Sequence, residues 1–521
     1  MMNITSDWYG PTSSSLVLRA LRRYPERIAF AWDGGSLTYS GALDLIGRFQ
    51  GVLRAAWPGP FVVAFLSANR AEAWCAEIAV QSLGVPVTWL HPMGALPDQL
   101  AQLSDCGAKT LIVDAKTFHQ RGGELAASAP SLRKIWTLGP TEFGVDLLAS
   151  AEGVGTVQAQ DQSKLNSVAT MNYTGGTTGQ SKAVVRQQHA HAAMWRAILE
   201  DFELPAVPQY LAAAPISHVA GTKIAPVLLR GGTVHLLQRF DPDEFLATVE
   251  RNGINMSLLV PTMIYTLLDD PSLNARNLKS LELLLYGASP MSPTRLVEAI
   301  DRIGPVFSQL YGQTECYPIS LLRKADHDVA DPELFASCGI PVTSVDVCLL
   351  DGDGRPVAAG EAGEICVRAP HAMTGYWQRD DLTREATAGG WLHTSDIARM
   401  DDRGFMFIVD RKKDMIVSGG FNVYPREVED VLTSDPRVAS AAVIGIPDAK
   451  WGEAVMAVVV PRPGAEIDAE SLSKLVKERK GAQHAPKRVE IVDKLPLTAL
   501  GKIDKKALRA PHWPANGRQV A

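Results

Sequence analysis

Paired cysteines, a surplus of one charge sign and long apolar runs are all absent from this sequence of 521 residues. Its six cysteines are scattered without a C-x-x-C pair, which excludes a disulfide framework and predicts free thiols in a reducing compartment. The formal net charge is only −6, a balance that does not suit broad binding to nucleic acid or anionic lipid. The most apolar long window, residues 210–229, contains Pro215, His218 and Lys223, so we expect no membrane span.

The beginning of the sequence also lacks a recognisable targeting signal. Residues 1–10 show neither a basic region followed by an apolar stretch nor an Arg/Ser-rich amphipathic pattern, so we expect no signal or transit peptide and a cytoplasmic location. Hydrophobic residues make up 46% of the chain, which excludes a disordered protein. At about 150 residues per domain, the length predicts three or four packing units.

Apolar runs alternate with helix-like segments over most of the chain. Strand-like runs lie at residues 61–66, 109–114, 232–237 and 256–260, and helical spacing is seen at residues 70–83 and 242–252. Alternation at this spacing is typical of parallel sheets covered by helices.

The pattern changes near residue 345. Short strands are expected at residues 345–350, 363–367 and 404–409, and the Asp/Gly clusters beside them at residues 351–354 and 401–404 are turn signals. These features predict a small antiparallel sheet. After residues 410–414 a compact unit follows, with expected helices at residues 425–432 and 468–480 and strands at residues 438–445 and 454–460.

Residues 173–182 read Tyr-Thr-Gly-Gly-Thr-Thr-Gly-Gln-Ser-Lys and are a candidate phosphate-binding loop. Glycines let backbone N–H groups converge on an anion, threonine hydroxyls add donors, and Lys182 adds a point charge suited to phosphate. The loop is not a Walker A motif, because Ser181 stands where the second glycine should be. A flexible surface turn is the alternative, so other segments must decide.

Further motif-like segments occur in a fixed order at residues 215–221, 286–290, 311–315, 394–396, 410–414, 419–429 and 495–503. Together with the loop they resemble the adenylate-forming superfamily of AMP-dependent synthetases and ligases. This superfamily includes acyl-CoA synthetases, adenylation domains of nonribosomal peptide synthetases and firefly-type luciferases. The sequence departs from the usual motifs at Gly175, Ser181, Ala183 and Ser395.

The resemblance implies an α/β fold. Residues 1–409 would form a large N-terminal adenylation domain of parallel, layered subdomains plus a small antiparallel β-barrel-like subdomain. Asp410 would be a hinge, and residues 411–521 a small mobile α+β C-terminal domain. It also implies an acid–thiol ligase: a carboxylate attacks the α-phosphate of ATP to give an acyl-adenylate and pyrophosphate, and the thiol of coenzyme A then takes the acyl group and releases AMP.

The same resemblance assigns the ATP site and its Mg²⁺ ion. Glu315 is the expected Mg²⁺ ligand, because a hard cation prefers carboxylate and phosphate oxygens. Thr314 would bond the α-phosphate, and Asp396 suits the ribose, since a carboxylate accepts two hydrogen bonds side by side. The remaining ATP-binding candidates are Thr174, Gly175, Gly176, Thr177, Thr178, Gly179, Lys182, Gly287, Ala288, Ser289, Tyr311, Gly312 and Arg411.

Lys502 is the principal catalytic candidate, because its ammonium group can bridge the incoming carboxylate and the α-phosphate. Rotation at Asp410 would withdraw this lysine after the first half-reaction, and Gly419 and Gly420 would then line the route of the thiol. His218 is expected to gate the acid site. With Val219, Gly221, Gly287 and Gly312 it would form part of an apolar pocket for a hydrophobic acyl or aryl acid.

Several alternatives stay open at this point. The enzyme could instead load a carrier-protein phosphopantetheine thiol, and a non-catalytic nucleotide-binding regulator is the alternative from another functional class. The identity of the acid, the thiol acceptor, the pathway and the oligomeric state are not determined by the sequence.

Overall fold

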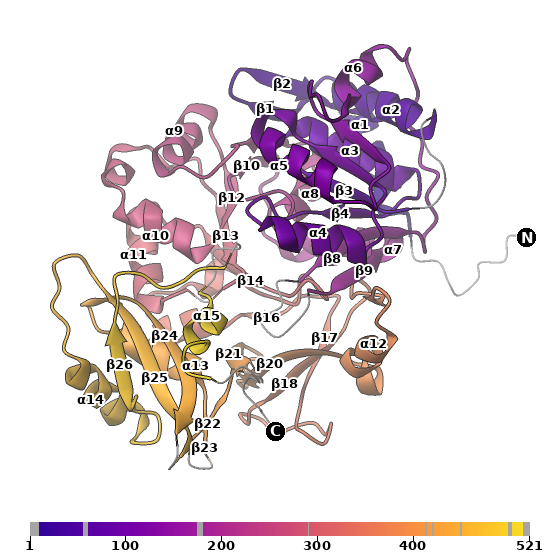
Figure 1. Cartoon of the computed structure of the whole chain (residues 1–521). Coiled ribbons are helices and arrows are strands. Elements are labelled where there is room, and N and C mark those ends of the chain that lie inside the picture. The colour runs from indigo at the N-terminus through magenta and orange to yellow at the C-terminus, as the bar shows by residue number, and fades with distance from the viewer. Residues whose placement is uncertain are drawn as a thin grey trace, which may run out of the picture.

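The computed structural model describes residues 10–55, 61–174, 181–289, 291–411, 414–418, 421–448, 451–498 and 503–513, with only the backbone at residues 410, 411, 421 and 422. Within these ranges the strands form four sheets, and the helices cover them (Figure 1).

The first large sheet has nine strands and a parallel centre. Its strands between β1 and β14 pair in parallel, whereas β2, β15 and β16 add antiparallel edges. The central strands are buried apolar runs, as expected for a parallel sheet covered on both faces. In spatial order they are β16 (Ile340–Pro341), β15 (Ser320–Leu322), β14 (Phe307–Tyr311), β13 (Leu283–Gly287), β12 (Met256–Leu259), β10 (Gln209–Ala212), β11 (Thr233–Leu236), β1 (Ile28–Trp32) and β2 (Gly35–Thr38).

The second large sheet has eight strands and is also parallel at its centre. Its antiparallel pairs lie at one edge, where β9 pairs with β8 and β19. In spatial order the strands are β19 (Gly375–Tyr376), β9 (Ala183–Gln187), β8 (Val168–Tyr173), β4 (Val87–Trp89), β3 (Val63–Leu66), β5 (Thr110–Val113), β6 (Lys134–Thr137) and β7 (Val145–Asp146).

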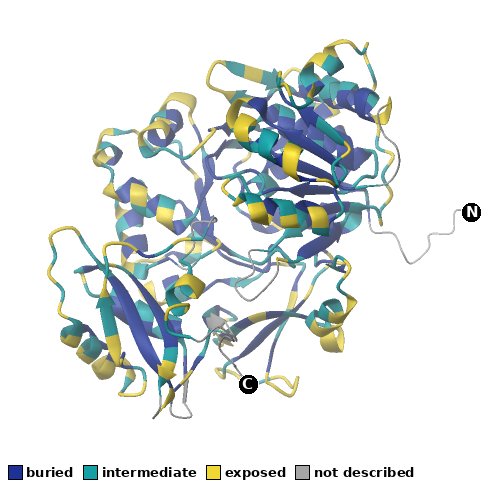
Figure 2. Ribbon diagram, viewed as in Figure 1, coloured by how far each residue is buried: buried dark blue, intermediate teal, exposed yellow. Residues whose placement is uncertain are grey.

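Helices fill the space between these sheets and cover their outer faces (Figure 2). One core cluster joins both sheets to α1 (Ser13–Arg23), α2 (Tyr39–Ala55), α3 (Ala71–Ser82), α7 (Gln188–Asp201) and α8 (Ile224–Leu229). On the outer faces lie α4 (Leu96–Asp105), α5 (Ala115–Ser128), α9 (Pro242–Asn252), α10 (Pro261–Asp269) and α11 (Pro293–Ile303). The helix α6 (Leu147–Glu152) follows β7.

Local sequence explains where these helices begin and end. Asp241 caps α9 by accepting a hydrogen bond from the N–H of Glu244 at 3.0 Å, and Pro242 fits the first helical position. The helix ends at Gly253, whose φ of 59° is left-handed and therefore suits glycine. The helix predicted at residues 242–252 is confirmed.

The third sheet is antiparallel and has four strands, in the order β17 (Asp346–Leu350), β18 (Gly363–Arg368), β20 (Leu392–Met400) and β21 (Met406–Arg411). The predicted Asp/Gly turns close its hairpins. Asp401 Oδ1 accepts hydrogen bonds from the N–H groups of Arg403 and Phe405, and Gly404 has a φ of 87°. Helix α12 (Asp380–Ala386) lies between β19 and β20 in the chain.

The last unit is a separate α+β layer. The long hairpin β24 (Val438–Asp448) and β25 (Gly452–Pro461) is its centre, with β22 (Ile416–Ser418), β23 (Phe421–Val423) and β26 (Arg488–Ile491) beside it. Helices α13 (Pro425–Thr433) and α14 (Ala469–Lys480) pack on one face around a core that includes Leu432 and Val476, and α15 (Lys505–Arg509) contacts β24. The predicted α/β fold class, with its antiparallel subdomain and small α+β C-terminal unit, is confirmed.

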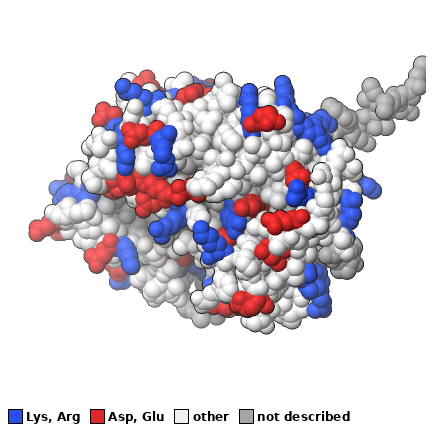
Figure 3. Space-filling view, turned by 90° about the horizontal axis from the view of Figure 1, so that it is seen from above, with Lys and Arg blue, Asp and Glu red and all other residues white. Residues whose placement is uncertain are grey.

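Two expectations from the composition concern the charge on the surface and the absence of a membrane-spanning helix. On the face seen from above, both acidic and basic side chains occur, and the acidic band at the left of the view has basic side chains beside it (Figure 3). Among the described residues, no helix combines the length and the apolar character needed to cross a membrane.

Candidate active site

The candidate active site lies where three of the sheets meet. The carboxyl ends of β13 and β14 face the β9–β19 edge of the eight-stranded sheet and strand β20 of the antiparallel sheet. Three hydrogen bonds show this meeting: Tyr311 to Asp396, Arg186 to the Thr314 carbonyl, and Tyr376 to Glu315. In open parallel sheets, ligands bind in the crevice outside the carboxyl ends of the strands.

Asp396 is a buried carboxylate whose orientation is fixed by two donors. The Tyr311 hydroxyl donates to Asp396 Oδ2 at 2.7 Å, and Gln313 Nε2 donates to the same oxygen at 2.6 Å. Gln313 Nε2 also donates to the Thr394 carbonyl at 2.7 Å. Burial, together with the neighbouring carboxylate, raises the pKa of the Tyr311 phenol well above its usual value, so the phenol keeps the proton that it donates. The arrangement presents an oriented acceptor at the end of β14.

Glu315 is held from its side chain and from its backbone. Tyr376 of β19 donates its hydroxyl to Glu315 Oε1 at 2.9 Å, and the N–H of Met373 donates to the Glu315 carbonyl at 2.7 Å. The Nζ of Lys182 lies 5.1 Å from the centre of the Tyr376 ring. Tyr376 therefore links the lysine of the candidate phosphate loop to the carboxylate predicted to bind Mg²⁺.

Arg186 of β9 fixes the segment that carries Thr314. The guanidinium group is buried, and its Nη2 donates to the Thr314 carbonyl at 2.8 Å. Burial lowers the pKa of Arg186, an effect that the Cys316 and Glu315 side chains oppose. A buried guanidinium with these contacts ties the residues after β14 to the second large sheet.

Close backbone contacts account for the glycines predicted to lie against the adenine and the acid. A Cβ atom added at Gly287 would lie 2.3 Å from the Leu310 carbonyl oxygen, and one at Gly312 would lie 2.8 Å from the Tyr317 ring. Ala288 follows with a left-handed φ of 66°, and Ser289 is half-buried beside it. Packing against neighbouring segments therefore requires both glycines, beside any role in binding a nucleotide.

The segment predicted to line the acid pocket forms a tight turn before α8. The Nδ1 of His218 lies 2.7 Å from Ser217 Oγ, and the His218 ring meets the His91 ring edge-on with centres 4.7 Å apart. Val219 packs against the main core, and a Cβ atom at Gly221 would lie 1.8 Å from the Ile216 carbonyl oxygen. The turn itself therefore requires Gly221, beside any role in binding an acid.

Several predicted site residues fall outside the described part of the chain: Gly175, Gly176, Thr177, Thr178, Gly179, Gly419, Gly420 and Lys502. Thr174 and Lys182, on either side of the phosphate loop, are described and half-buried. Asp410 and Arg411 are the last two residues of β21, where the backbone of Arg411 pairs with that of Asp396. The roles predicted for these residues stay predictions.

Comparison with known proteins decides the family. The family profile described as AMP-binding enzyme matches residues 17–377, and the profile described as AMP-binding enzyme C-terminal domain matches residues 427–502. The chain belongs to the AMP-binding enzyme family. The superfamily predicted from the sequence motifs is thereby confirmed.

Relatives of this AMP-binding enzyme include two named CoA ligases. The medium/long-chain-fatty-acid–CoA ligase FadD8 of Mycobacterium tuberculosis is 42% identical, over 97% of this chain and 91% of that protein. A feruloyl-CoA synthase of Amycolatopsis is 35% identical, over 94% and 97%. Among solved structures, the amide bond synthetase McbA from Marinactinospora thermotolerans matches with a TM-score of 0.89 and 33% identity, over 96% of this chain and 99% of McbA.

Three contact residues of this AMP-binding enzyme were missed by sequence reasoning: Arg186, Gln313 and Tyr376. Arg186 and Tyr376 belong to neighbouring strands that are far apart in the sequence, and neither stands in a motif. Gln313 occupies the variable position of its motif, so its bonds to Asp396 and Thr394 have no local signal. Tyr376 reaches the site through the pairing of β19 with β9, and Gln313 through side-chain hydrogen bonds to residues of β20.

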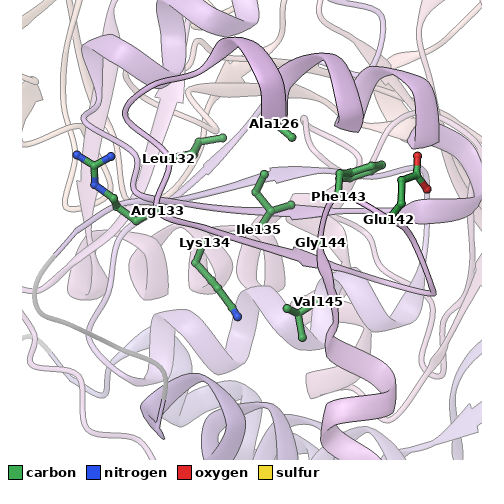
Figure 4. A pocket seen from close by; sticks show the side chains of 9 residues that line it. All are labelled: Ala126, Leu132, Arg133, Lys134, Ile135, Glu142, Phe143, Gly144 and Val145. Atoms are coloured by element: carbon green, nitrogen blue, oxygen red, sulfur yellow. The ribbon is translucent and has the colours of Figure 1, made fainter.

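Two other features of this enzyme lie outside the site. A shallow pocket beside β6 and β7, lined by residues that include Arg133, Lys134 and Glu142, is at the opposite edge of the eight-stranded sheet from β9 and β19 (Figure 4). In the antiparallel sheet, Glu364, Cys366 and His393 place ligand-type atoms within 4.8 Å of one another. His393 Nδ1 lies 3.3 Å from Cys366 Sγ and 3.2 Å from Glu364 Oε2, which are hydrogen-bonding distances.

Proposed function

We propose that this enzyme activates a hydrophobic carboxylic acid with ATP and transfers the acyl group to the thiol of coenzyme A. The observation that carries the proposal is the Asp396 carboxylate, buried at the carboxyl end of β14 and oriented by Tyr311 and Gln313. An oriented carboxylate at this place suits the two ribose hydroxyls of a nucleotide. The named CoA ligases among the relatives confirm the predicted reaction class, an acid–thiol ligase that forms an acyl-adenylate.

In the first half-reaction two anions must meet, so neutralising charge is the main task of the protein. Lys182 and Lys502 supply positive charge to the phosphates and the carboxylate. A carboxylate oxygen of the acid attacks the α-phosphorus, the bond to the bridging oxygen breaks, and pyrophosphate leaves. Arg186 acts indirectly here, because it holds the backbone that places Thr314 toward the α-phosphate.

Mg²⁺ fits the donor set and is part of the proposal. Glu315 offers a carboxylate with one oxygen anchored by Tyr376, and carboxylate plus phosphate oxygens are what this cation prefers. The ion would supply charge neutralisation at the phosphates. The hydrogen bond from Tyr376 would keep the Glu315 carboxylate facing the phosphates.

The second half-reaction needs access for the thiol, which attacks the carbonyl carbon of the acyl-adenylate and displaces AMP. We assign residues 1–409 and 411–521 to two domains with a hinge at Asp410. Support comes from the position of Asp410 near the end of β21, immediately before the separate α+β layer. Rotation there would withdraw Lys502 and bring Gly419 and Gly420 toward the acyl group.

The proposed cytoplasmic location is supported by the six cysteines, which all lie in the described ranges and form no disulfide there.

Lys223 favours an acid with a single carboxylate. Its Nζ is buried and lies 2.6 Å from the Tyr317 hydroxyl, 2.8 Å from Thr222 Oγ1 and 3.3 Å from the Val219 carbonyl oxygen. Burial lowers its pKa well below the usual lysine value. In all three contacts Lys223 Nζ is the donor, and an amine or ammonium nitrogen has at most three N–H groups to give. Lys223 therefore has no donor left for a second carboxylate, and the acid is expected to be hydrophobic beyond its reactive end.

The acceptor is tested by one assay with three arms. A panel of fatty, aryl and dicarboxylic acids is incubated with ATP, and AMP release is measured with coenzyme A, with a phosphopantetheinylated carrier protein, or with amines. We expect acid-dependent AMP release to be fastest with coenzyme A. An amine acceptor is the second candidate, favoured by the 33% identity to an amide bond synthetase over 99% of its chain. Absence of acid-dependent AMP release in every arm would leave a nucleotide-binding regulator.

Replacing Tyr376 by phenylalanine is expected to raise the Mg²⁺ concentration that gives half-maximal adenylation by about tenfold. The variant loses one hydrogen bond to a charged carboxylate, worth about 1.5 kcal/mol, or roughly tenfold. The measurement is a Mg²⁺ titration of acid-dependent pyrophosphate exchange, with binding of Mn²⁺–ATP followed calorimetrically as a second readout. Tyr24→Phe is the control, because that ring packs against Arg27 in the N-terminal subdomain. An unchanged Mg²⁺ dependence in Tyr376→Phe would show that this bond does not position Glu315.

A further inference from the structure

Asp396 lies in an irregular part of β20, a bulge where this strand pairs with β18. Glu364 pairs with Ile397 and Cys366 pairs with His393, so the single residue Ile365 faces the three residues Thr394, Ser395 and Asp396. Within this bulge, Ser395 has a left-handed φ of 60°. A residue with a Cβ atom disfavours that conformation, which glycine adopts freely. The backbone just before Asp396 therefore needs support from outside.

The side chain of Glu364 provides that support. Its Oε1 accepts a hydrogen bond from the Ser395 N–H at 2.9 Å, and the residue is only 7% exposed. Thr394 holds the other side of the bulge, because its hydroxyl donates to the Ile365 carbonyl at 2.7 Å and accepts from the Asp396 N–H at 3.1 Å. The strained residue is thus clamped by a charged acceptor on the neighbouring strand.

Glu364 is itself held in place by His393. The Nδ1 of His393 lies 3.2 Å from Glu364 Oε2, and its Nε2 lies 3.2 Å from the Ala388 carbonyl oxygen. A carbonyl and a carboxylate both only accept, so His393 holds Glu364 and the Ala388 carbonyl together when both ring nitrogens carry a proton. The side chain of Glu364 therefore has little rotational freedom.

We propose that Glu364 is a positioning residue that acts through the Ser395 N–H to aim the Asp396 carboxylate at the ribose of ATP. Through the Ser395 N–H, Glu364 acts on the bulge that carries Asp396. The inference rests on the proposed function, since it takes Asp396 as the ribose ligand. The proposal predicts that loss of Glu364 weakens ATP binding and leaves acid binding unchanged. The segments predicted to line the acid pocket belong to the nine-stranded sheet and its loops.

The test combines Glu364→Ala and Glu364→Gln with Ser395→Gly. Glu364→Ala is expected to raise the KM for ATP and the dissociation constant of ATP by about tenfold, with the KM for the acid unchanged. Glu364→Gln is expected to have a smaller effect, because the amide oxygen still accepts the Ser395 N–H. In the Ser395→Gly background, where the left-handed turn no longer needs the clamp, the effect of Glu364→Ala is expected to shrink to less than threefold. Thermal unfolding identifies any variant that fails to fold, in which case Glu364→Gln carries the test.

Glu361→Ala is the matched control, since Glu361 is an exposed glutamate three residues earlier in the same hairpin. Equal effects of Glu364→Ala in the wild-type and Ser395→Gly backgrounds, or a wild-type KM for ATP in Glu364→Ala, would overturn the positioning role while leaving the proposed function intact. Failure of the wild-type protein to bind ATP in calorimetry would instead overturn the proposed function, and the inference with it.

Discussion

Lys502→Ala is expected to slow acid-dependent ATP–pyrophosphate exchange by about 10²–10³-fold while largely sparing thioester formation from supplied acyl-adenylate. The ammonium group counters negative charge that develops as the carboxylate attacks the α-phosphate, and losing one such preorganised contact costs about 10²–10³ in rate. The thiol attack on a finished adenylate meets no second anion at phosphorus, so it does not need this charge. The two rates are measured separately, by isotope exchange and by thioester formation.

Lys506 provides the control for this substitution. It is an exposed lysine four residues later, at the start of α15, and Lys506→Ala is expected to leave both rates within about twofold of wild type. The match of the C-terminal family profile ends at residue 502, so Lys502 belongs to the shared part of the domain whereas Lys506 does not. Near-normal exchange in Lys502→Ala would remove this lysine from the adenylation step.

The fold followed from the sequence because its signals are local. The apolar runs that became β3, β5, β11 and β12 are buried strands, and the Asp/Gly clusters at residues 351–354 and 401–404 became hairpin turns. The start of α9 was readable from one capping aspartate and one proline, and its end from one glycine. Each of these features needs only neighbouring residues to specify it.

The site was less predictable because its contacts join distant strands. Tyr311 was expected to bind ATP, and the structure adds a hydrogen bond from its hydroxyl to Asp396 that no local pattern indicates. Glu315 was found by its motif, but the phenol that orients it belongs to β19, which reaches the site only through pairing with β9. Ser395 departs from the usual motif, and its left-handed φ, which glycine adopts freely, gives that departure a physical consequence.

Asp396→Ala is expected to raise the KM for ATP by about 10²-fold. The carboxylate is predicted to accept two ribose hydroxyls, and two hydrogen bonds to a charged group at about 1.5 kcal/mol each give about 3 kcal/mol, or roughly 10²-fold. The same change leaves the Tyr311 hydroxyl and Gln313 Nε2 without their shared acceptor. The KM for the acid is expected to stay close to wild type, because the acid does not touch the ribose.

A comparison of ATP with 2′,3′-dideoxy-ATP isolates the ribose contacts from this structural disturbance. Wild-type enzyme is expected to prefer ATP by about 10²-fold, and Asp396→Ala to show almost no preference, because the missing hydroxyls and the missing carboxylate remove the same bonds. Asp402→Ala, at an exposed aspartate in the turn after β20, is the control and should keep the wild-type preference. A preference for ATP that survives in Asp396→Ala would mean that other groups bind the ribose. The contacts of Asp396 with Tyr311 and Gln313 would then serve to join β14 to β20.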